Sequence, residues 1–288
     1  MSKDNDKVII THPEKIIYPE DQITKQMVVD YYNQIAPKMY ELNKNHILSM
    51  QRFPEGINKE GFWHKNCPDF FPKWIKRFKT IKENEEPISY IVISKPEIFP
   101  FVANYYSVVN HIWTSTSLKP NEPDRIIFDL DPSLENDFAK VQEVAINMHT
   151  ELNKLKLSNF VMTTGSRGLH VVLPIKEIYT HAQVKIFAQN FADYIVNLIP
   201  NITTTNIKKE KREDKIFIDI LRNNYAQTAI APYSLRALAG APVAAPIDWD
   251  EVFSSSLHPN NYTLFDIDKL QKNINWQNFN KLKNNLII

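Results

Sequence analysis

The sequence is poor in the residues that make disulfides, zinc sites and membrane spans. Cys67 is the single cysteine among 288 residues, which excludes an internal disulfide and is typical of a reducing cytoplasm. No second Cys or His pair accompanies it to complete a zinc site. No apolar run reaches the roughly 18 residues that a membrane span needs, and the N-terminus lacks the hydrophobic region of a secretory signal. We therefore expect a cytoplasmic protein without a membrane partner.

Glycine, excess charge and repeats are also scarce. With five glycines and no proline-rich tract, the chain has no obvious linker, so residues 1–288 are predicted to form a single domain, with one body or two lobes. The formal net charge of +1 neither indicates nor excludes nucleic acid, because binding needs only a local basic surface. Residues 73–79 supply one candidate, since three lysines and an arginine alternate there with Trp, Ile and Phe.

Against this background, two aspartates one residue apart are the most informative feature. Asp129 and Asp131 close the run 125–131, and the two-residue period of a strand points both carboxylates to one face. Two like charges side by side favour a divalent cation between them. Aspartate before Pro132 is also common turn chemistry, so the motif alone leaves both interpretations open.

A second segment carries polar groups on a turn. Residues 163–174 read as a hairpin in which glycines flank Ser166 and Arg167. Glycine permits positive φ and close backbone approach to a ligand, and exposed amides with a hydroxyl and a guanidinium suit a phosphate. His170 lies on the face of the second strand opposite its apolar residues, so it can point into the same cavity.

A third segment places one carboxylate in an otherwise apolar strand. Asp219 interrupts residues 215–222, where an unpartnered charge would be costly. A salt bridge to a nearby Arg or Lys is one explanation. A third metal ligand on a separate strand is the other, because two-metal sites share carboxylates.

Amphipathic helices separate these motifs. Each is expected to pack one apolar stripe into the core. In residues 137–156 the stripe is Phe138, Val141, Ala145, Met148, Leu152 and Leu155, and in residues 181–199 it is Val184, Phe187, Phe191, Ile195 and Leu198. Strands precede, separate and follow these helices. The order predicts a mixed α/β (α+β) fold whose catalytic sheet is partly antiparallel. The segment from Asp248 to the C-terminus is predicted to be helix or loop.

The three motifs resemble those of the polymerase domain of bacterial DNA ligase D, in the archaeo-eukaryotic primase superfamily. The D-x-D pair, the Ser-to-His turn and strand, and the isolated aspartate correspond to Asp129 with Asp131, Ser166 with His170, and Asp219. The runs 228–236 and 240–246 are similar to the family's C-terminal signature. The resemblance covers nearly the whole chain and implies a primase-polymerase fold.

The resemblance also implies roles for single residues. The nucleotide would be bound by His111, Ser166, Arg167, His170, Arg222 and Arg236. A DNA 5′-phosphate would contact Lys15 and Lys25, the template base would stack on Phe62 and Trp63, and the DNA backbone would meet Lys65 and Arg212. Trp63 departs from the more usual Phe-Phe pair. Thr24 is a plausible N-cap of a helix beginning at Lys25, whose backbone amides would share the phosphate.

The activity implied is template-directed transfer of NTPs or dNTPs to DNA 3′ ends at short gaps or double-strand breaks. Asp129, Asp131 and Asp219 would hold two divalent ions; the family prefers Mn²⁺, and the hard oxygen ligands do not separate it from Mg²⁺. Expected partners are DNA ends with a 5′-phosphate, an end-binding protein such as Ku and a separate DNA ligase. Ligase and nuclease modules, which often accompany this domain, lie outside these 288 residues.

Rival functions from other classes stay open at this stage. They are a metal-dependent nuclease, a stand-alone primase of a mobile element, and a catalytically degenerate DNA-end-binding module.

Overall fold

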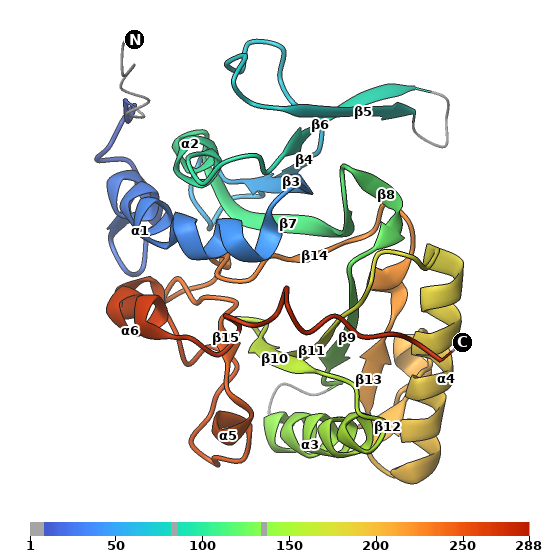
Figure 1. Cartoon of the computed structure of the whole chain (residues 1–288). Helices are drawn as coiled ribbons and strands as arrows, with labels where there is room; N and C mark the ends of the chain where they lie inside the picture. The colour runs from blue at the N-terminus through green and yellow to red at the C-terminus, as the bar shows by residue number, and fades with distance from the viewer. Residues whose placement is uncertain (1–8, 82–85, 134–136, 288) are drawn as a thin grey trace.

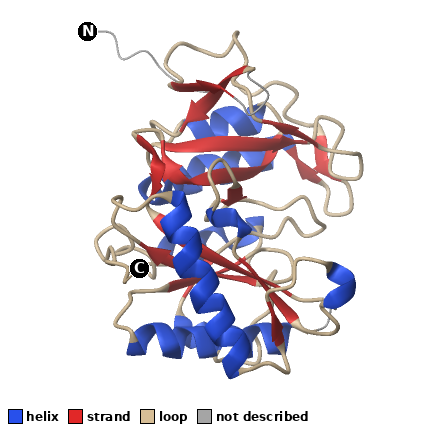
Figure 2. Cartoon of the chain, turned by 90° about the vertical axis from the view of Figure 1, so that its right-hand side faces the viewer, coloured by secondary structure: helices blue, strands red, loops and turns tan. Residues whose placement is uncertain are grey.

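The computed structural model describes residues 9–81, 86–133 and 137–287. Two main sheets carry the architecture, and Figure 2 shows them one above the other. Pairing within both sheets is antiparallel apart from one parallel pair, β12 with β13. The observed fold is therefore a mixed α/β fold with a partly antiparallel sheet that bears the aspartates, as predicted.

The six-stranded sheet carries all three predicted aspartates. Its order is β12-β13-β9-β11-β10-β15. The strands are β12 (Thr203–Thr204), β13 (Ile216–Asp219), β9 (Arg125–Asp131), β11 (Leu169–Pro174), β10 (Phe160–Thr163) and β15 (Pro246–Ile247). Helices α3 (Phe138–Lys154) and α4 (His181–Leu198) pack on this sheet, with Phe128 of β9 against Phe191 of α4. Because successive residues of a strand point to opposite faces, this packing turns Asp129 and Asp131 away from the helices.

The second sheet, in the upper half of Figure 1, is formed mostly by the N-terminal part of the chain. Its path is β14-β7-β3-β6-β5, with β4 paired to β3 and β8 paired to β7. The strands are β3 (His46–Arg52), β4 (Phe62–His64), β5 (Arg77–Ile81), β6 (Pro87–Val92), β7 (Ser107–Thr116), β8 (Lys119–Pro123) and β14 (Thr228–Ile230). Helices α1 (Lys25–Asn43) and α2 (Ile98–Asn104) pack together beside it.

Short elements complete the chain. A small sheet pairs β1 (Ile16–Tyr18) with β2 (Ile23–Thr24). Single helical turns are η1 (Lys209–Lys211), η2 (Leu221–Asn223) and η3 (Leu264–Asp266), and the short helices are α5 (Trp249–Val252) and α6 (Ile267–Lys272). The C-terminal segment is helix and loop, as predicted. In the described part of the chain, no helix is long and apolar enough to cross a membrane.

Local predictions agree with the structure over most elements. Thr24 is the N-cap of α1, and its hydroxyl accepts a hydrogen bond from the amide of Met27 (3.3 Å). The two predicted amphipathic helices are α3 and α4, but Leu155 and Leu198 are 51% and 44% exposed. Both stand at or beyond the last helical residue, so the expectation that they pack inward was wrong.

The third predicted strand is shorter than its apolar pattern suggests. We expected a strand through residues 215–222, whereas β13 ends at Asp219 and the chain turns into η2. One carboxylate oxygen of Asp219 accepts a hydrogen bond from the amide of Leu221 (2.7 Å), which favours a turn over an extended chain.

Candidate active site

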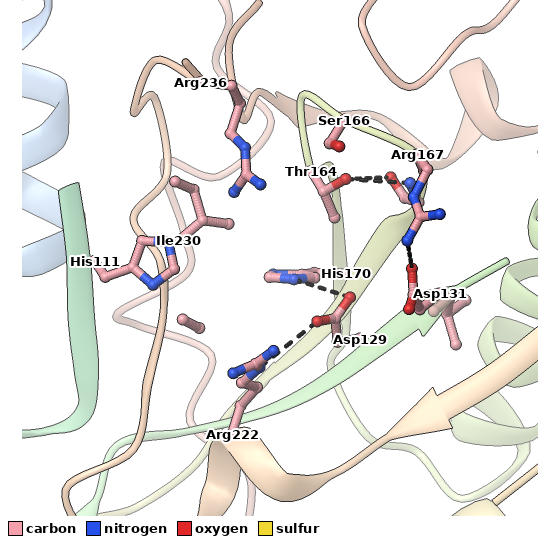
Figure 3. Close-up of a pocket in the computed structure, with 13 residues that line it drawn as sticks. His111, Asp129, Asp131, Thr164, Ser166, Arg167, His170, Arg222, Ile230 and Arg236 are labelled. Atoms are coloured by element: carbon pink, nitrogen blue, oxygen red, sulfur yellow. Dashed lines mark hydrogen bonds and ion pairs between the residues drawn. The ribbon is translucent and has the colours of Figure 1, made fainter. Parts of the chain in front are cut away.

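A pocket of about 220 Å³ lies between the two sheets. His111 on β7 and Ile230 on β14 come from one sheet, while Asp129 on β9 and His170 on β11 come from the other (Figure 3). The pocket is lined by His111, Asp129, Leu130, Asp131, Thr164, Ser166, Arg167, Gly168, His170, Arg222, Ala229, Ile230 and Arg236. The predicted nucleotide-binding residues, scattered over more than a hundred positions, are thus brought together.

Three polar side chains form a row across neighbouring strands. Asp129 pairs in register with His170 on one side and with Asp219 on the other. Directly paired residues share a face of the sheet, so the two carboxylates and the imidazole stand side by side. His170 Nε2 lies 3.3 Å from Asp129 Oδ1. His170 Nδ1 is buried with no hydrogen-bond partner in the described structure, which leaves a polar atom for a bound substrate to satisfy.

The aspartates differ in their electrostatic environment. Burial pushes the pKa of Asp129 upward, but the charge and hydrogen bond of His170, together with Arg222 and Arg236, outweigh burial and lower it. Burial raises the pKa of Asp131, and the charge of Asp129 adds to this effect. Burial likewise raises the pKa of Asp219, partly offset by its hydrogen bond from Leu221. A nearby cation would therefore do most to favour the ionised form of Asp131 and Asp219.

The turn after β10 holds Arg167 over the pocket. The hydroxyl of Thr164 bonds both the amide and the carbonyl of Gly168, each at 3.1 Å, and closes the turn. Gly165 has φ of +65°, and a Cβ there would lie 2.8 Å from the backbone of Val243. A Cβ on Gly168 would lie 2.0 Å from the Leu130 carbonyl oxygen. The glycines thus allow the turn to pack on neighbouring backbone and bring Arg167 beside the D-x-D strand.

Guanidinium groups neutralise the carboxylates. Arg167 Nη2 lies 3.1 Å from Asp131 Oδ1. Arg222 bridges two aspartates, with Nε 3.7 Å from Asp129 Oδ2 and Nη2 3.8 Å from Asp219 Oδ2. Arg236 enters from the opposite wall (Figure 3). Three guanidiniums facing a pocket of this size suit a polyphosphate.

Arg212, predicted to contact the DNA backbone, is mostly buried (7% exposed) and lies outside the pocket lining. Its guanidinium donates to the carbonyls of Asn206 (3.0 Å) and Ile207 (2.8 Å) and lies over the ring of Phe217. Arg212 Nη1 is 3.7 Å from Asp131 Oδ2, so the guanidinium lies beside the carboxylate that ends the D-x-D strand. Lys65, the other predicted backbone contact, is exposed.

The aspartates suit divalent cations by donor type and by placement. They offer hard oxygen donors, which Mg²⁺ and Mn²⁺ prefer, from one face of two paired strands. Among the described residues, no three His, Cys, Asp or Glu side chains converge tightly enough to form a ready metal cluster. Asp131 turns to Arg167 and Asp219 to Leu221 and Arg222.

The predicted template aromatics flank the pocket. Phe62 and Trp63 are each 47% exposed, so neither belongs to the core. The Trp63 ring meets the His111 ring edge-on at 4.8 Å between centroids, and Arg52 lies over the Phe62 ring. Burial, with the charges of Arg236 and Arg222, holds the pKa of His111 well below its usual range. A neutral imidazole therefore connects the aromatic strand β4 with the pocket.

The two lysines predicted to bind a 5′-phosphate meet over one aromatic ring. The ammonium groups of Lys15 and Lys25 lie 5.5 and 4.3 Å from the ring centroid of Tyr106. Lys25 is fully buried, and its Nζ donates to the carbonyl (2.5 Å) and hydroxyl (2.9 Å) of Thr11. Burial, with the charge of Lys15, lowers the pKa of Lys25 to about 8. Lys15 pairs with the exposed Glu55 at 3.3 Å.

The backbone amides at the start of α1 are occupied, contrary to expectation. The amide of Lys25 donates to the Lys15 carbonyl (2.8 Å), and that of Gln26 donates to the Pro13 carbonyl (3.0 Å). The amide of Met27 donates to Thr24. The prediction that these amides share a phosphate was wrong, and a phosphate here would depend on the lysine ammonium groups.

Several lining residues were not identified from the sequence. Thr164 closes the glycine turn, and Ala229 with Ile230 forms an apolar wall. The signal for Thr164 was present, since it directly precedes the first glycine of the turn. Ala229 and Ile230 lie in the run 228–236 that resembles the family signature, but no local pattern assigns them to the pocket, which they reach through the pairing of β14 with β7.

A pocket between two sheets that combines a D-x-D strand with three guanidiniums, beside a further carboxylate on the neighbouring strand, is typical of enzymes that act on metal-bound polyphosphates. A family model described as "LigD, primase-polymerase domain" matches residues 24–276. The chain therefore belongs to the LigD primase-polymerase domain family.

Relatives and a solved structure agree with this assignment. The chain is 32% identical over 254 residues to the multifunctional non-homologous end joining protein LigD of Mycolicibacterium smegmatis, covering 88% of this chain and 33% of that protein. It is 28% identical to the bifunctional LigD of Bacillus subtilis, covering 92% of this chain and 43% of that protein. The polymerase domain of Mycobacterium tuberculosis Ligase D in complex with DNA superposes with a TM-score of 0.89 at 26% identity, covering 96% of this chain and 99% of that one. The chain thus spans less than half the length of these two LigD relatives.

Proposed function

We propose that this chain is a template-directed nucleotidyltransferase that extends DNA 3′ ends at short gaps or double-strand breaks, using NTPs or dNTPs, during end joining. The observation that carries the proposal is that the D-x-D strand and three guanidinium groups line one pocket between the sheets, with Arg167 and Arg222 within ion-pair distance of the aspartates. Membership of the LigD primase-polymerase family and the likeness to a DNA-bound polymerase domain support it. We propose that residues 1–288 form one catalytic domain.

The pocket residues divide between the parts of a nucleotide. Arg167, Arg222 and Arg236 would hold the triphosphate, because guanidinium groups match phosphate oxygens in pairs. Ser166 on the turn would add a hydroxyl donor. His111 and His170 stand on opposite walls and would contact the sugar and the phosphates (Figure 3).

Asp129, Asp131 and Asp219 would hold two divalent ions, Mn²⁺ or Mg²⁺. When bound, the ions supply the positive charge that lowers the pKa of the 3′-hydroxyl and stabilises the leaving pyrophosphate. His170 holds Asp129 in place through the 3.3 Å contact, and its charge favours the ionised carboxylate. Arg167 and Arg222 would move from the carboxylates to the phosphates as the substrate binds.

The DNA would approach on the side of β4 and the N-terminal segment. Phe62 and Trp63 offer half-exposed rings on which a template base can stack, and Lys65 is exposed next to them. The ammonium pair of Lys15 and Lys25 would receive the 5′-phosphate at the far side of a gap. We expect a Ku-like end-binding protein and a separate DNA ligase as partners before and after extension.

The test is primer extension across a gap of one to a few nucleotides with Mn²⁺ and either NTPs or dNTPs. We expect template-matched addition that releases pyrophosphate, improves with a 5′-phosphate and disappears in the Asp129→Ala/Asp131→Ala double variant. DNA binding without addition would overturn the polymerase and leave the end-binding module. Strand initiation from nucleotides alone would favour the stand-alone primase, and cleavage without pyrophosphate release would favour a nuclease.

A further inference from the structure

The side-chain amide of Asn223 takes the place of a missing strand beside β9. The ladder between β13 and β9 ends at the pair Asp219 and Asp129. In continued register, the next position exchanging hydrogen bonds on β9 is Ile127. Its amide donates to Asn223 Oδ1 and its carbonyl accepts from Asn223 Nδ2, both at 2.8 Å. One carboxamide therefore makes the two bonds that a strand residue would make.

Further bonds hold Asn223 from two other directions. Its Nδ2 also donates to the Ile220 carbonyl (2.9 Å), inside the turn that follows β13. Its own carbonyl lies 3.0 Å from Nδ1 of His181 at the start of α4, and the other ring nitrogen of His181 faces the Pro120 carbonyl at 3.1 Å. Asn223 has no exposed surface. The turn η2 is thus fixed to β9, to itself and to α4.

The residue before Asn223 is the arginine that bridges two aspartates. Arg222 extends from η2 into the pocket and lies within 3.8 Å of Asp129 and Asp219 (Figure 3). Asn223 does not line the pocket. Any effect of Asn223 on a nucleotide must therefore act through the position of η2 and of the guanidinium that it carries.

We propose that Asn223 is a positioning residue, whose carboxamide continues the β9 ladder and thereby sets Arg222 between Asp129 and Asp219 for nucleotide binding. This inference rests on the proposed function, because it assigns Arg222 to the triphosphate. Aspartate at position 223 keeps the shape of the side chain but cannot donate to the carbonyls of Ile127 and Ile220. The turn would shift, and Arg222 with it.

Asn284 provides a matched structural control beside β10 and β11 of the same sheet. Its Nδ2 donates to the carbonyls of Pro174 (2.8 Å) and Ser158 (2.7 Å), and its Oδ1 accepts from the amide of Ser158 (2.8 Å). It is 7% exposed and does not line the pocket. An Asn284→Asp variant therefore loses the same kind of buried amide donor without touching η2.

The experiment compares Asn223→Asp, Asn284→Asp and wild type by thermal unfolding and by equilibrium titration with a fluorescent NTP and Mn²⁺. Both variants should lower Tm. Only Asn223→Asp should raise the nucleotide Kd, by roughly tenfold or more, the size expected when a charge-assisted hydrogen bond is misplaced. The titration is done below the Tm of each variant, so that only folded protein is compared.

A double-mutant cycle with Arg222→Ala tests whether Asn223 acts through the arginine. In the Arg222→Ala background, Asn223→Asp should change the nucleotide Kd less than twofold. Equal effects of the Asn223 and Asn284 variants, or a full tenfold effect in the Arg222→Ala background, would overturn the positioning role. If wild type and both variants bind and extend alike, the positioning role fails and the proposed function stands. If wild type binds no nucleotide, both fail.

Discussion

Replacing Arg167 with Gln should make the nucleotide-free protein bind Mn²⁺ more tightly while it binds nucleotide more weakly. The guanidinium lies 3.1 Å from Asp131, a carboxylate assigned to the metal, so an arriving ion must displace it. Without Arg167, the ion no longer competes with this intramolecular cation. The same variant loses one of three guanidiniums proposed to hold the triphosphate, and nucleotide affinity should fall.

The size of the gain follows from the geometry of the pair. Two unit charges about 3 Å apart attract by roughly 1 kcal/mol in water and by several kcal/mol at an effective dielectric constant near 20. The Arg167 and Asp131 side chains are 43% and 33% exposed, so solvent screening places the pair near the lower end. If the ion no longer has to displace an ion pair worth about 0.5 to 1 kcal/mol, Mn²⁺ should bind roughly two- to fivefold more tightly.

The assay is a Mn²⁺ titration without nucleotide, read from the electron paramagnetic resonance signal of the free ion. Arg236→Gln is the control, because it removes the same charge from the pocket and, among the described residues, Arg236 has no carboxylate within ion-pair distance. The increase in Mn²⁺ affinity should be smaller for Arg236→Gln than for Arg167→Gln. The increase for Arg167→Gln should shrink at high salt. Equal Mn²⁺ affinity in Arg167→Gln and wild type, or equal gains in the two variants, would refute direct competition at Asp131.

Three further outcomes are expected. Asp219→Asn should abolish extension and leave DNA binding, measured by fluorescence anisotropy, unchanged, because the carboxylate acts on the metal; retained extension would remove Asp219 from the site. The preference for gaps with a 5′-phosphate should fall as the pH rises through about 8, because Lys25 loses its proton there while the phosphate keeps its charge. A preference that stays constant from pH 7 to 9 would contradict a role for the charge of Lys25. Trp63→Ala should weaken binding to gapped DNA by about 1 to 3 kcal/mol and Trp63→Phe by much less, and equal losses would show that stacking is not involved.

Local patterns determined the parts of the site that lie within a few consecutive residues. A two-residue period is enough to place Asp129 and Asp131 on one face, since alternation is a property of the extended backbone itself. Glycines on both sides of Ser166 and Arg167 are enough to predict the turn, although their tight packing is against Leu130 and Val243. The same holds for the Thr24 cap, whose hydroxyl needs a partner only three residues away.

Contacts between distant segments were decided by the tertiary structure alone. Lys25 reads as a surface cation until the backbone and hydroxyl of Thr11 surround its ammonium group. Nothing in the local sequence shows that the guanidinium of Arg212 donates to the carbonyls of Asn206 and Ile207. Each outcome depends on which backbone groups are left unpaired nearby, and a periodic pattern carries no information about them.

The end of β13 shows most clearly how local patterns and contacts between distant segments divide the control of the structure. The apolar pattern around Asp219 predicts a strand, and hydrophobicity alone supports it through Leu221. The strand stops because Asp219 accepts a hydrogen bond from Leu221 and because Asn223 satisfies Ile127 on a strand almost a hundred positions earlier. The amino-acid sequence thus determined which chemical groups the pocket contains, whereas the pairing of β9, β11, β13 and β7 decided which of them face one another, because hydrogen bonding between distant strands sets their distances.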